Sequence, residues 1–200
     1  IDLNTKQLDL AQKFSGELCN HQNNYKFINL NIYDTKVEDI GGAFDVIMLR
    51  DVIEHIPNQE KFIGFLKQFV KKDGIIFFGY PPWYMPFGGH QQGCKSVLRK
   101  IPYFHILPAF LYTGILKLFG EPENRIKSLL NTKSTGISIE RFRKAVKNNG
   151  WKVLDETLYL INPNYEVKFN LQPKKQYKIL GVIPFFRNFV TTCAYYLVKK

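Results

Sequence analysis

The sequence FDVIMLRDVIEHIP, residues 44–57, joins a short apolar run to an abrupt polar break. Val46 to Leu49 are all apolar, and so short a run between polar residues is typical of a strand buried on both faces, as in a parallel sheet. Arg50 and Asp51 then interrupt it. Because ligands bind at the carboxyl ends of strands in open α/β sheets, we expect a site at this break. Taken alone, however, the pattern is explained better by a core strand followed by an ordinary loop.

The residues before this stretch predict a strand, a helix and a second strand. Ile1–Asn4 has the pattern of the end of a strand, and Tyr25–Leu30 predicts another. Between them, Thr5 is expected to cap a helix that Gly16 ends. A strand that ends in an acid and turns into a helix is typical of nucleotide-binding α/β folds, where the acid can accept hydrogen bonds from a ribose.

The residues after the stretch continue the alternation of helices and strands. The predicted elements are a helix capped by Asn58, a strand at Gly74–Gly79, a helix from Ser138 to Gly150, and strands at Trp151–Ile161 and Phe189–Val198. Phe62, Phe65, Leu66, Phe69 and Val70 form one apolar stripe on the first of these helices, which predicts core packing and not a cofactor site. We therefore expect a single α/β domain over residues 1–200.

This organisation resembles class I S-adenosylmethionine-dependent methyltransferases, the group that includes the ubiquinone and menaquinone biosynthetic methyltransferases. The resemblance is carried by Phe44-Asp45, by the turn ending in Glu54-His55, and by Lys72-Asp73-Gly74 before the next strand. Order and spacing agree from Ile1 to about Tyr80 and again from Ile139 to Trp151. The resemblance implies a Rossmann-like sheet with an antiparallel last strand, and S-adenosylmethionine-dependent methyl transfer to an oxygen, nitrogen or carbon acceptor. Oxygen is the expected acceptor atom, because the glutamines and aromatic residues of the 80–93 loop suit hydroxyl-rich ligands.

The resemblance also implies which residues bind the cofactor, S-adenosylmethionine. Asp2, followed by Leu3, is expected at the ribose hydroxyls, and Asn31 and Ile32 at the adenine. The family often has an acid where Asn31 stands, but the amide oxygen can still accept a hydrogen bond. The residues expected beside the methionine and adenine are Leu49, Arg50, Asp51 and Val52.

One family feature has no counterpart in this sequence, namely the first strand with its glycine-rich loop. Gly41-Gly42 follows an acidic loop, and Gly88-Gly89 lies far downstream. We therefore expect the amino end to be truncated relative to the family, and this chain alone to be inactive if the loop is absent. A non-enzymatic methyltransferase-like binding module with an incomplete cofactor site stays open as the alternative.

Residues 80–93, YPPWYMPFGGHQQG, predict a shaped loop at the carboxyl end of the strand that precedes them. Prolines restrict this backbone and glycines relax it. Aromatic surface with a few hydrogen-bonding groups suits a small-molecule pocket, and the family places its acceptor here. The expected acceptor contacts are Trp83, Tyr84, Phe87, Gln91 and Gln92. The competing interpretation is a surface loop held in place by its aromatic residues.

Two histidines are candidates for a catalytic base, because an imidazole accepts a proton near neutral pH. His90 follows a flexible glycine pair, which would let the loop bring it to a ligand. His55 stands next to Glu54 and could simply orient its turn. No metal site is expected, since the histidines and cysteines show no ligand spacing.

Residues 101–120 are strongly apolar, but Pro102, His105, Pro108 and Lys117 interrupt them, so a membrane-spanning helix is not expected. A helical lid over the pocket is favoured, as part of a substrate loop and lid insertion at residues 81–137. An interfacial membrane segment is the alternative.

The distribution of charge and the cysteine content indicate which partners and which cellular compartment to expect. Residues 1–92 carry 9 Lys and Arg against 11 Asp and Glu, whereas residues 93–200 carry 19 against 6. The excess of positive charge in residues 93–200 suits an anionic partner, although lysines scattered over the surface also explain this excess. The expected acceptor is a small molecule, or a lipid- or sugar-linked one, that carries negative charge. Cys19, Cys94 and Cys193 are odd in number and far apart, which favours a reducing cytoplasm, with peripheral membrane contact left open.

Two further functions are disfavoured. An NAD-dependent oxidoreductase would also place Asp2 on a ribose, but the Glu54-His55 turn and the antiparallel ending speak against it. A nucleic-acid-binding protein would explain the charge, yet no RNA-binding aromatic strand or helix-turn-helix signature is found.

Overall fold

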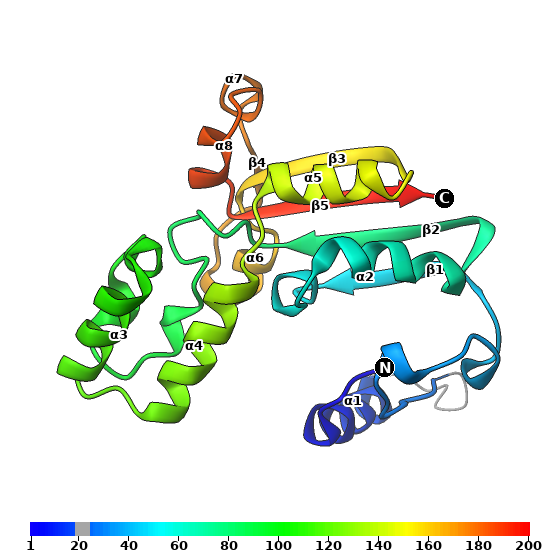
Figure 1. Ribbon diagram of the computed structural model, residues 1–200, viewed down its shortest axis with the longest axis horizontal. Coiled ribbons are helices and arrows are strands. Elements are labelled where there is room, and N and C mark those ends of the chain that lie inside the picture. Colours follow the sequence, from blue (N-terminus) through cyan, green and yellow to red (C-terminus); the bar gives the residue numbers. More distant parts are fainter. Residues whose placement is uncertain (19–24) are drawn as a thin grey trace. The chain divides into compact units, whose positions relative to one another are not determined.

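The computed structural model describes residues 1–18 and 25–200, and Cys19 lies outside them (Figure 1). The chain divides into two compact units, Ile1–Ala43 and Phe44–Lys200, each of which is described by itself.

The first unit contains the helix α1, Thr5–Leu18, and the short 3-10 helices η2, Ile32–Asp34, and η3, Glu38–Ile40. The side-chain oxygen of Asn4 accepts a hydrogen bond from the backbone N–H of Lys6 at 3.1 Å. Asn4 therefore caps this helix, and the prediction that Thr5 does so is wrong. Gly16 does not end the helix either, because an interior glycine costs only about 1 kcal/mol relative to alanine.

The two strands predicted in this unit do not form in the part of it that the structure describes. Asp2 and Asn29 make a single parallel bridge, in which the N–H of Asp2 donates to the carbonyl of Ile28 at 3.2 Å. Two paired segments are marginal without a third strand to extend the sheet. No third strand supports this pair within the described residues of the unit, so pairing stops at one bridge.

The second unit is built on a five-stranded sheet of order β1-β2-β5-β3-β4 (Figure 1). Its strands are β1 Phe44–Arg50, β2 Val70–Tyr80, β3 Lys152–Ile161, β4 Lys174–Lys175 and β5 Cys193–Lys199. β1 and β2 are parallel, and β5 runs antiparallel between β2 and β3, which confirms the antiparallel ending. The last strand starts later than predicted, because Phe189 belongs to the helix α8, Phe186–Phe189.

One face of β1 is exposed, so the prediction that this strand is buried on both faces is wrong. Among the described residues of the unit it pairs with β2 alone. Val46 is 54% exposed and Met48 70%. Its apolar run resembles that of a strand buried on both faces, but the run does not show whether a second layer covers the strand.

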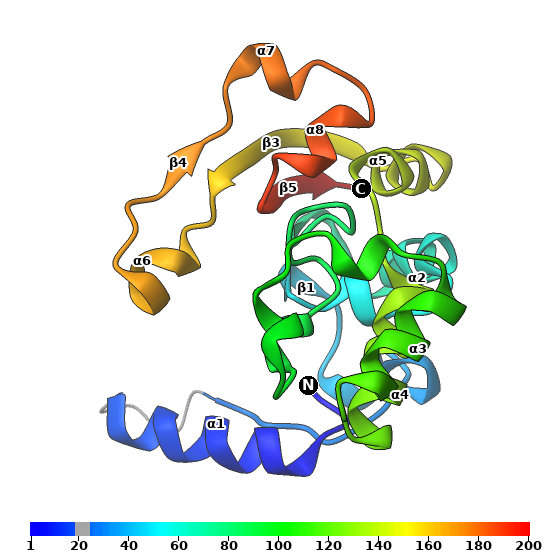
Figure 2. The same cartoon turned by 90° about the vertical axis from the view of Figure 1, so that its left-hand side faces the viewer.

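Helices α2, Gln59–Phe65, and α5, Ile139–Asn148, cover the same face of the sheet (Figures 1 and 2). Both predicted caps are confirmed. Asn58 Oδ1 accepts from the N–H of Lys61 at 3.3 Å, and Ser138 Oγ accepts from the N–H of Arg141 at 3.1 Å. The apolar stripe after Asn58 also packs inward, although its last turn becomes the 3-10 helix η5, Leu66–Phe69. Val70, which was predicted to end the stripe, instead begins β2.

The centre of the core is an aromatic cluster between this helical layer and the sheet. Phe142 of α5 is fully buried, and its ring centroid lies 5.1 Å from that of Phe78, 4.9 Å from Tyr80 and 4.6 Å from Tyr196. The cluster joins α5 to β2 and β5, and so holds the central strands in place.

Residues 81–137 form a helical insertion beyond the carboxyl ends of β1 and β2 (Figure 1). The insertion contains α3, Ala109–Leu118, and α4, Glu123–Thr135, and three 3-10 helices, η6 Gln91–Gly93, η7 Val97–Lys100 and η8 Phe104–Ile106. It has its own core, made by Cys94, Leu98, Phe104, Tyr112, Leu116, Ile126 and Leu129. Among the described residues, no helix is both long and apolar enough to cross a membrane.

The connection from β3 to β5 is longer and more structured than a simple turn. It contains α6, Asn164–Phe169, then β4, α7, Lys178–Gly181, and α8. Figure 2 shows it running along one side of the sheet and over its end.

Candidate functional site

The turn after β1 is set by an unusual backbone conformation at Asp51. Its φ is 54°, in the left-handed region that few non-glycine residues adopt, and its N–H donates to the carbonyl of Gly79 at 2.8 Å. The chain then enters the 3-10 helix η4, Ile53–His55. This turn places Glu54 and His55 at the carboxyl end of the parallel strands, where the sequence predicted a site.

Glu54 is a buried carboxyl group in this turn. Its side chain is 3% exposed, and neither oxygen has a hydrogen-bond partner among the described residues. Burial, assisted by the negative charge of Asp51, raises the pKa of Glu54 to about 8. The carboxyl group is therefore protonated at neutral pH and can donate a hydrogen bond.

His90 approaches the same turn from the 80–93 loop. Its own φ is 57°, and the preceding Gly89 lies so close to His105 that an added Cβ would come within 2.1 Å of the Cβ of His105. The loop therefore needs glycine at position 89, as the glycine pair suggested.

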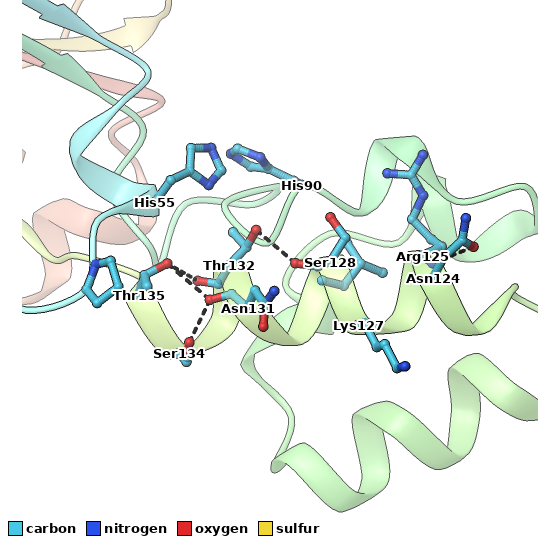
Figure 3. Close-up of a pocket in the computed structure, with 12 residues that line it drawn as sticks. His55, His90, Asn124, Arg125, Lys127, Ser128, Asn131, Thr132, Ser134 and Thr135 are labelled. Carbon is cyan, nitrogen blue, oxygen red and sulfur yellow. Dashed lines mark hydrogen bonds between the residues drawn. The ribbon is translucent and has the colours of Figure 1, made fainter. Parts of the chain in front are cut away.

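The rings of His55 and His90 meet edge to face, with centroids 5.0 Å apart (Figure 3). His55 Nε2 lies 4.0 Å from Glu54 Oε1. Burial lowers the pKa of both histidines, and the neighbouring His55 lowers that of His90 further. Both rings are therefore neutral at pH 7 and can accept a proton. The structure thus brings together the two predicted catalytic residues.

A pocket of about 790 Å³ lies between these histidines and α4 (Figure 3). The residues that line it are His55, Pro57, His90, Asn124, Arg125, Lys127, Ser128, Leu129, Asn131, Thr132, Ser134 and Thr135. Thr135 Oγ1 donates to the backbone carbonyl of Glu54 at 2.7 Å, and Gln59 Nε2 donates to the backbone carbonyl of Thr135. These bonds fix the end of α4 against the turn.

The lining of the pocket is polar and carries positive charge. Arg125 and Lys127 contribute cations, and the other polar residues contribute hydroxyl and amide groups, but no carboxylate is among the residues that line the pocket. Such a lining suits a ligand that is rich in hydroxyl groups and carries negative charge.

Glu54, His55 and His90 could also hold a single metal ion. One ligand atom from each lies within 4.8 Å of the others. The expectation that no metal binds rested on spacing along the sequence, and spacing does not reveal that the 80–93 loop returns to the turn after β1. A carboxylate with two imidazoles is a donor set that divalent transition metals accept.

The residues predicted to contact the acceptor have other surroundings. Gln91 is fully buried and donates to the carbonyl of Ile101 at 3.1 Å, so it fixes the loop. The ring of Trp83 packs edge to face on His105 at 4.7 Å. Tyr84 packs on Phe189 at 5.5 Å. None of the five predicted residues, Trp83, Tyr84, Phe87, Gln91 and Gln92, lines the described pocket.

The predicted cofactor residues fall into both units. Asp2, Leu3, Asn31 and Ile32 belong to the first, and Leu49, Arg50, Asp51 and Val52 to the second. Asp2 is exposed, and its Oδ1 accepts from the N–H of Asn4 at 2.7 Å. Asn31 Oδ1 accepts from the N–H of Tyr33 at 3.2 Å and caps η2. An exposed carboxylate and a half-buried amide match the acceptors that an adenosine requires.

Sequence reasoning missed the α4 wall of the pocket. The polar residues of this helix recur at intervals of three and four, as Asn124, Ser128, Asn131 and Thr135 do, opposite an apolar face that contains Ile126 and Leu129. This spacing was available as a signal, but the segment was taken for part of a lid.

The sequence matches a family model and a curated relative. A family model described as "Methyltransferase domain" matches residues 6–156. A ubiquinone biosynthesis O-methyltransferase of Actinobacillus pleuropneumoniae serotype 7 is 29% identical over 86 residues, which are 39% of this chain and 33% of that protein. This chain thus matches about a third of the relative's length.

A solved structure shares the fold. The structure of PKMT2 from Rickettsia typhi in complex with AdoHcy aligns with a TM-score of 0.51 at 14% identity, over 99% of this chain and 43% of that one. A possible histamine N-methyltransferase from Thermotoga maritima aligns at 14% identity with a TM-score of 0.44, over 79% of this chain and 57% of that one. The predicted Rossmann-like α/β fold class is confirmed.

Proposed function

The chain belongs to the methyltransferase domain family, and from this premise we propose that it transfers a methyl group from S-adenosylmethionine to an oxygen of a small acceptor. The observation that carries the proposal is the meeting of His90, His55 and Glu54 beside a polar pocket at the carboxyl end of the sheet. In this arrangement a base faces the space in which an acceptor would lie.

S-adenosylmethionine, when bound, supplies an already activated methyl group, so the protein has to position the acceptor and receive its proton. His90 is neutral at pH 7 because its pKa is lowered, and it accepts the proton of the acceptor hydroxyl. His55 packs against that ring, and Glu54 lies behind His55 as a protonated carboxyl group. This order supports His90 as the base and His55 as the residue that orients it.

Each unit by itself contains groups that suit a part of the cofactor. Asp2 and Asn31 offer acceptors for the ribose and the adenine, and the turn at Asp51 offers the carboxyl end of β1. The structural neighbour from Rickettsia typhi is described with AdoHcy, the product that remains after methyl transfer from S-adenosylmethionine, which supports the same cofactor here.

The acceptor is proposed to carry hydroxyl groups and a negative charge. Arg125 and Lys127 provide the cations, and the absence of a carboxylate from the lining favours an anion. A phosphorylated or lipid-linked sugar intermediate and a quinone precursor both fit this description. The curated relative is a ubiquinone biosynthesis O-methyltransferase, which supports oxygen as the acceptor atom.

The test is a screen with S-adenosylmethionine that carries an isotopic label in its methyl group, using the full-length protein. We expect the label to appear in a small anionic compound that carries hydroxyl groups. The His90→Ala variant should lose this methyl transfer but still bind the cofactor. Label found only on nitrogen, or transfer that is unchanged in the His90 variant, would contradict the proposed chemistry.

A further inference from the structure

The connection between β3 and β5 presents an exposed apolar surface that the proposed reaction does not use. We call residues 177–186 the apolar tip. Six of its large apolar side chains are between 42% and 73% exposed, namely Tyr177, Ile179, Val182, Ile183, Phe185 and Phe186. So many adjacent apolar side chains in water indicate a surface that binds something.

Polar contacts hold the apolar tip in place. Glu140 of α5 accepts from the backbone N–H of Phe185 at 2.9 Å and from Arg187 Nε at 2.8 Å. Gln176 Nε2 donates to Thr191 Oγ1 at 2.7 Å on the other side. These bonds anchor both ends of the tip to the second unit and leave the apolar side chains facing out.

The backbone of the tip is strained at its most prominent aromatic residue. Phe185 has a φ of 61°, in the left-handed region that is rare for an aromatic residue. Its side chain is nevertheless 67% exposed, so the strain is not compensated by burial of the ring within the chain. The hydrogen bond from its N–H to Glu140 holds this conformation and keeps the ring in solvent.

The charge around the apolar tip has one sign. Lys174, Lys175 and Lys178 are exposed, and no Asp or Glu follows Glu166 in the sequence. Glu140, the acid that does contact the tip, is paired with the buried Arg187. The surface therefore combines apolar side chains with uncompensated lysines.

We propose that the apolar tip docks this protein on the surface of a membrane that contains anionic lipids. Apolar side chains enter the boundary between headgroups and acyl chains, while the flanking lysines pair with anionic headgroups. A nucleic acid would match the lysines but would leave the six apolar side chains in water. An acidic protein surface would have the same difficulty unless it also carried an apolar groove.

The experiment measures how the 200-residue chain partitions onto sedimented vesicles of phosphatidylcholine with about 30% phosphatidylglycerol, against phosphatidylcholine alone. Binding is expected to the anionic vesicles, and to weaken as salt is raised. The double variant Ile179→Ser with Val182→Ser is expected to weaken it by about tenfold or more. The triple variant Lys174→Gln, Lys175→Gln and Lys178→Gln is expected to weaken binding to the anionic vesicles by about tenfold or more as well.

Matched variants separate the apolar tip from general surface effects. Phe110 and Leu118 of α3 are 73% and 81% exposed, so Phe110→Ser with Leu118→Ser tests equally exposed apolar residues elsewhere. Lys144→Gln, Lys147→Gln and Lys152→Gln test exposed lysines on α5 and β3. Both control variants are expected to bind the anionic vesicles like the wild type.

Three results would overturn the proposal. The first is equal partitioning of the wild type and the Ile179/Val182 variant. The second is a loss of binding in the α3 control that equals the loss in the tip variant. The third is a wild-type dimer that the tip variant dissociates, without vesicle binding by either, since a second copy of the chain would then be the partner.

Discussion

The rings of His55 and His90 meet edge to face with their centroids 5.0 Å apart, although one follows β1 and the other belongs to the loop after β2. Because β1 and β2 are parallel, their carboxyl ends meet at one edge of the sheet, and the two loops converge there. The convergence creates the pocket on which the proposed function rests.

Replacing His90 by Ala is expected to lower turnover by about 100-fold or more, because the proton of the acceptor loses its base. The Kd for S-adenosylmethionine should stay unchanged, since His90 faces the acceptor. Steady-state kinetics and calorimetry on the full-length protein measure the two quantities. Lys95→Ala, an exposed change a few residues further on, is the control. Wild-type turnover in the His90 variant would remove this residue from the reaction.

Replacing Glu54 by Gln is expected to change how stability depends on pH. The pKa of Glu54 is raised from 4.5 to about 8 in the folded chain, so between these values the unfolded state releases a proton that the folded state keeps. Stability of the wild type therefore falls as pH rises through this window, by up to about 1.4 kcal/mol per pH unit from this group. The Gln variant lacks this pH-dependent contribution to the free energy of unfolding.

Urea unfolding of both proteins across the window measures the difference between their free energies of unfolding. The difference should grow in favour of the Gln variant from about pH 5 to about pH 8 and then level off. The exposed Glu166→Gln change controls for the substitution itself. A difference that stays constant over this range would show that Glu54 is not the buried acid described here.

Replacing Arg125 by Ala is expected to raise the KM for an anionic acceptor by about tenfold or more, with a smaller effect on kcat, because the charge contributes to binding. Arg125 lines the pocket, whereas Lys144 is exposed on α5. The Lys144→Ala variant, which also removes one positive charge, is therefore the control. The same kinetics on a neutral analogue of the acceptor should show little difference between Arg125→Ala and the wild type. An equal rise in KM for the neutral analogue would argue against recognition of the negative charge.

Replacing Phe142 by Ala is expected to destabilise the chain by about 3–5 kcal/mol, because it empties the centre of the aromatic cluster. Phe110→Ala removes an equally large but 73% exposed side chain and should change stability by about 0.5 kcal/mol or less. Chemical denaturation measures both. Similar losses for the two variants would mean that Phe142 is not central to the core.

Local sequence patterns predicted the parts of the fold that local interactions determine. Asn58 and Ser138 cap their helices as expected, since a cap depends on a few adjacent residues. The alternation of elements also held in the second unit. The error at β1 has the opposite origin, because whether both faces of a strand are buried depends on the layers that pack on it and not on its own residues.

Only part of the candidate site could be predicted from the sequence, because the rest depends on contacts between segments that are far apart in the chain. His55 and His90 follow strands, and the meeting of strand ends is a general property of parallel sheets. The α4 wall with Arg125 and Thr135 depends on how an insertion folds back, which the pattern of residues 101–137 does not specify. Likewise, Gln91 looks like a ligand contact in sequence but is fully buried as a support of its loop.

The central claim is most directly tested by calorimetric titration of S-adenosylmethionine into the full-length protein and its Asp2→Ala variant. Asp2 is expected to hold both ribose hydroxyls, through charge-assisted bonds worth about 1.5–3 kcal/mol each, so its loss should weaken binding by more than about tenfold. Asp9→Ala, which removes another exposed acid of the same unit, is the control and should bind like the wild type. The account predicts saturable binding that Asp2→Ala impairs and Asp9→Ala leaves intact. Absence of binding by the wild-type protein, or equal affinity in all three, would contradict it.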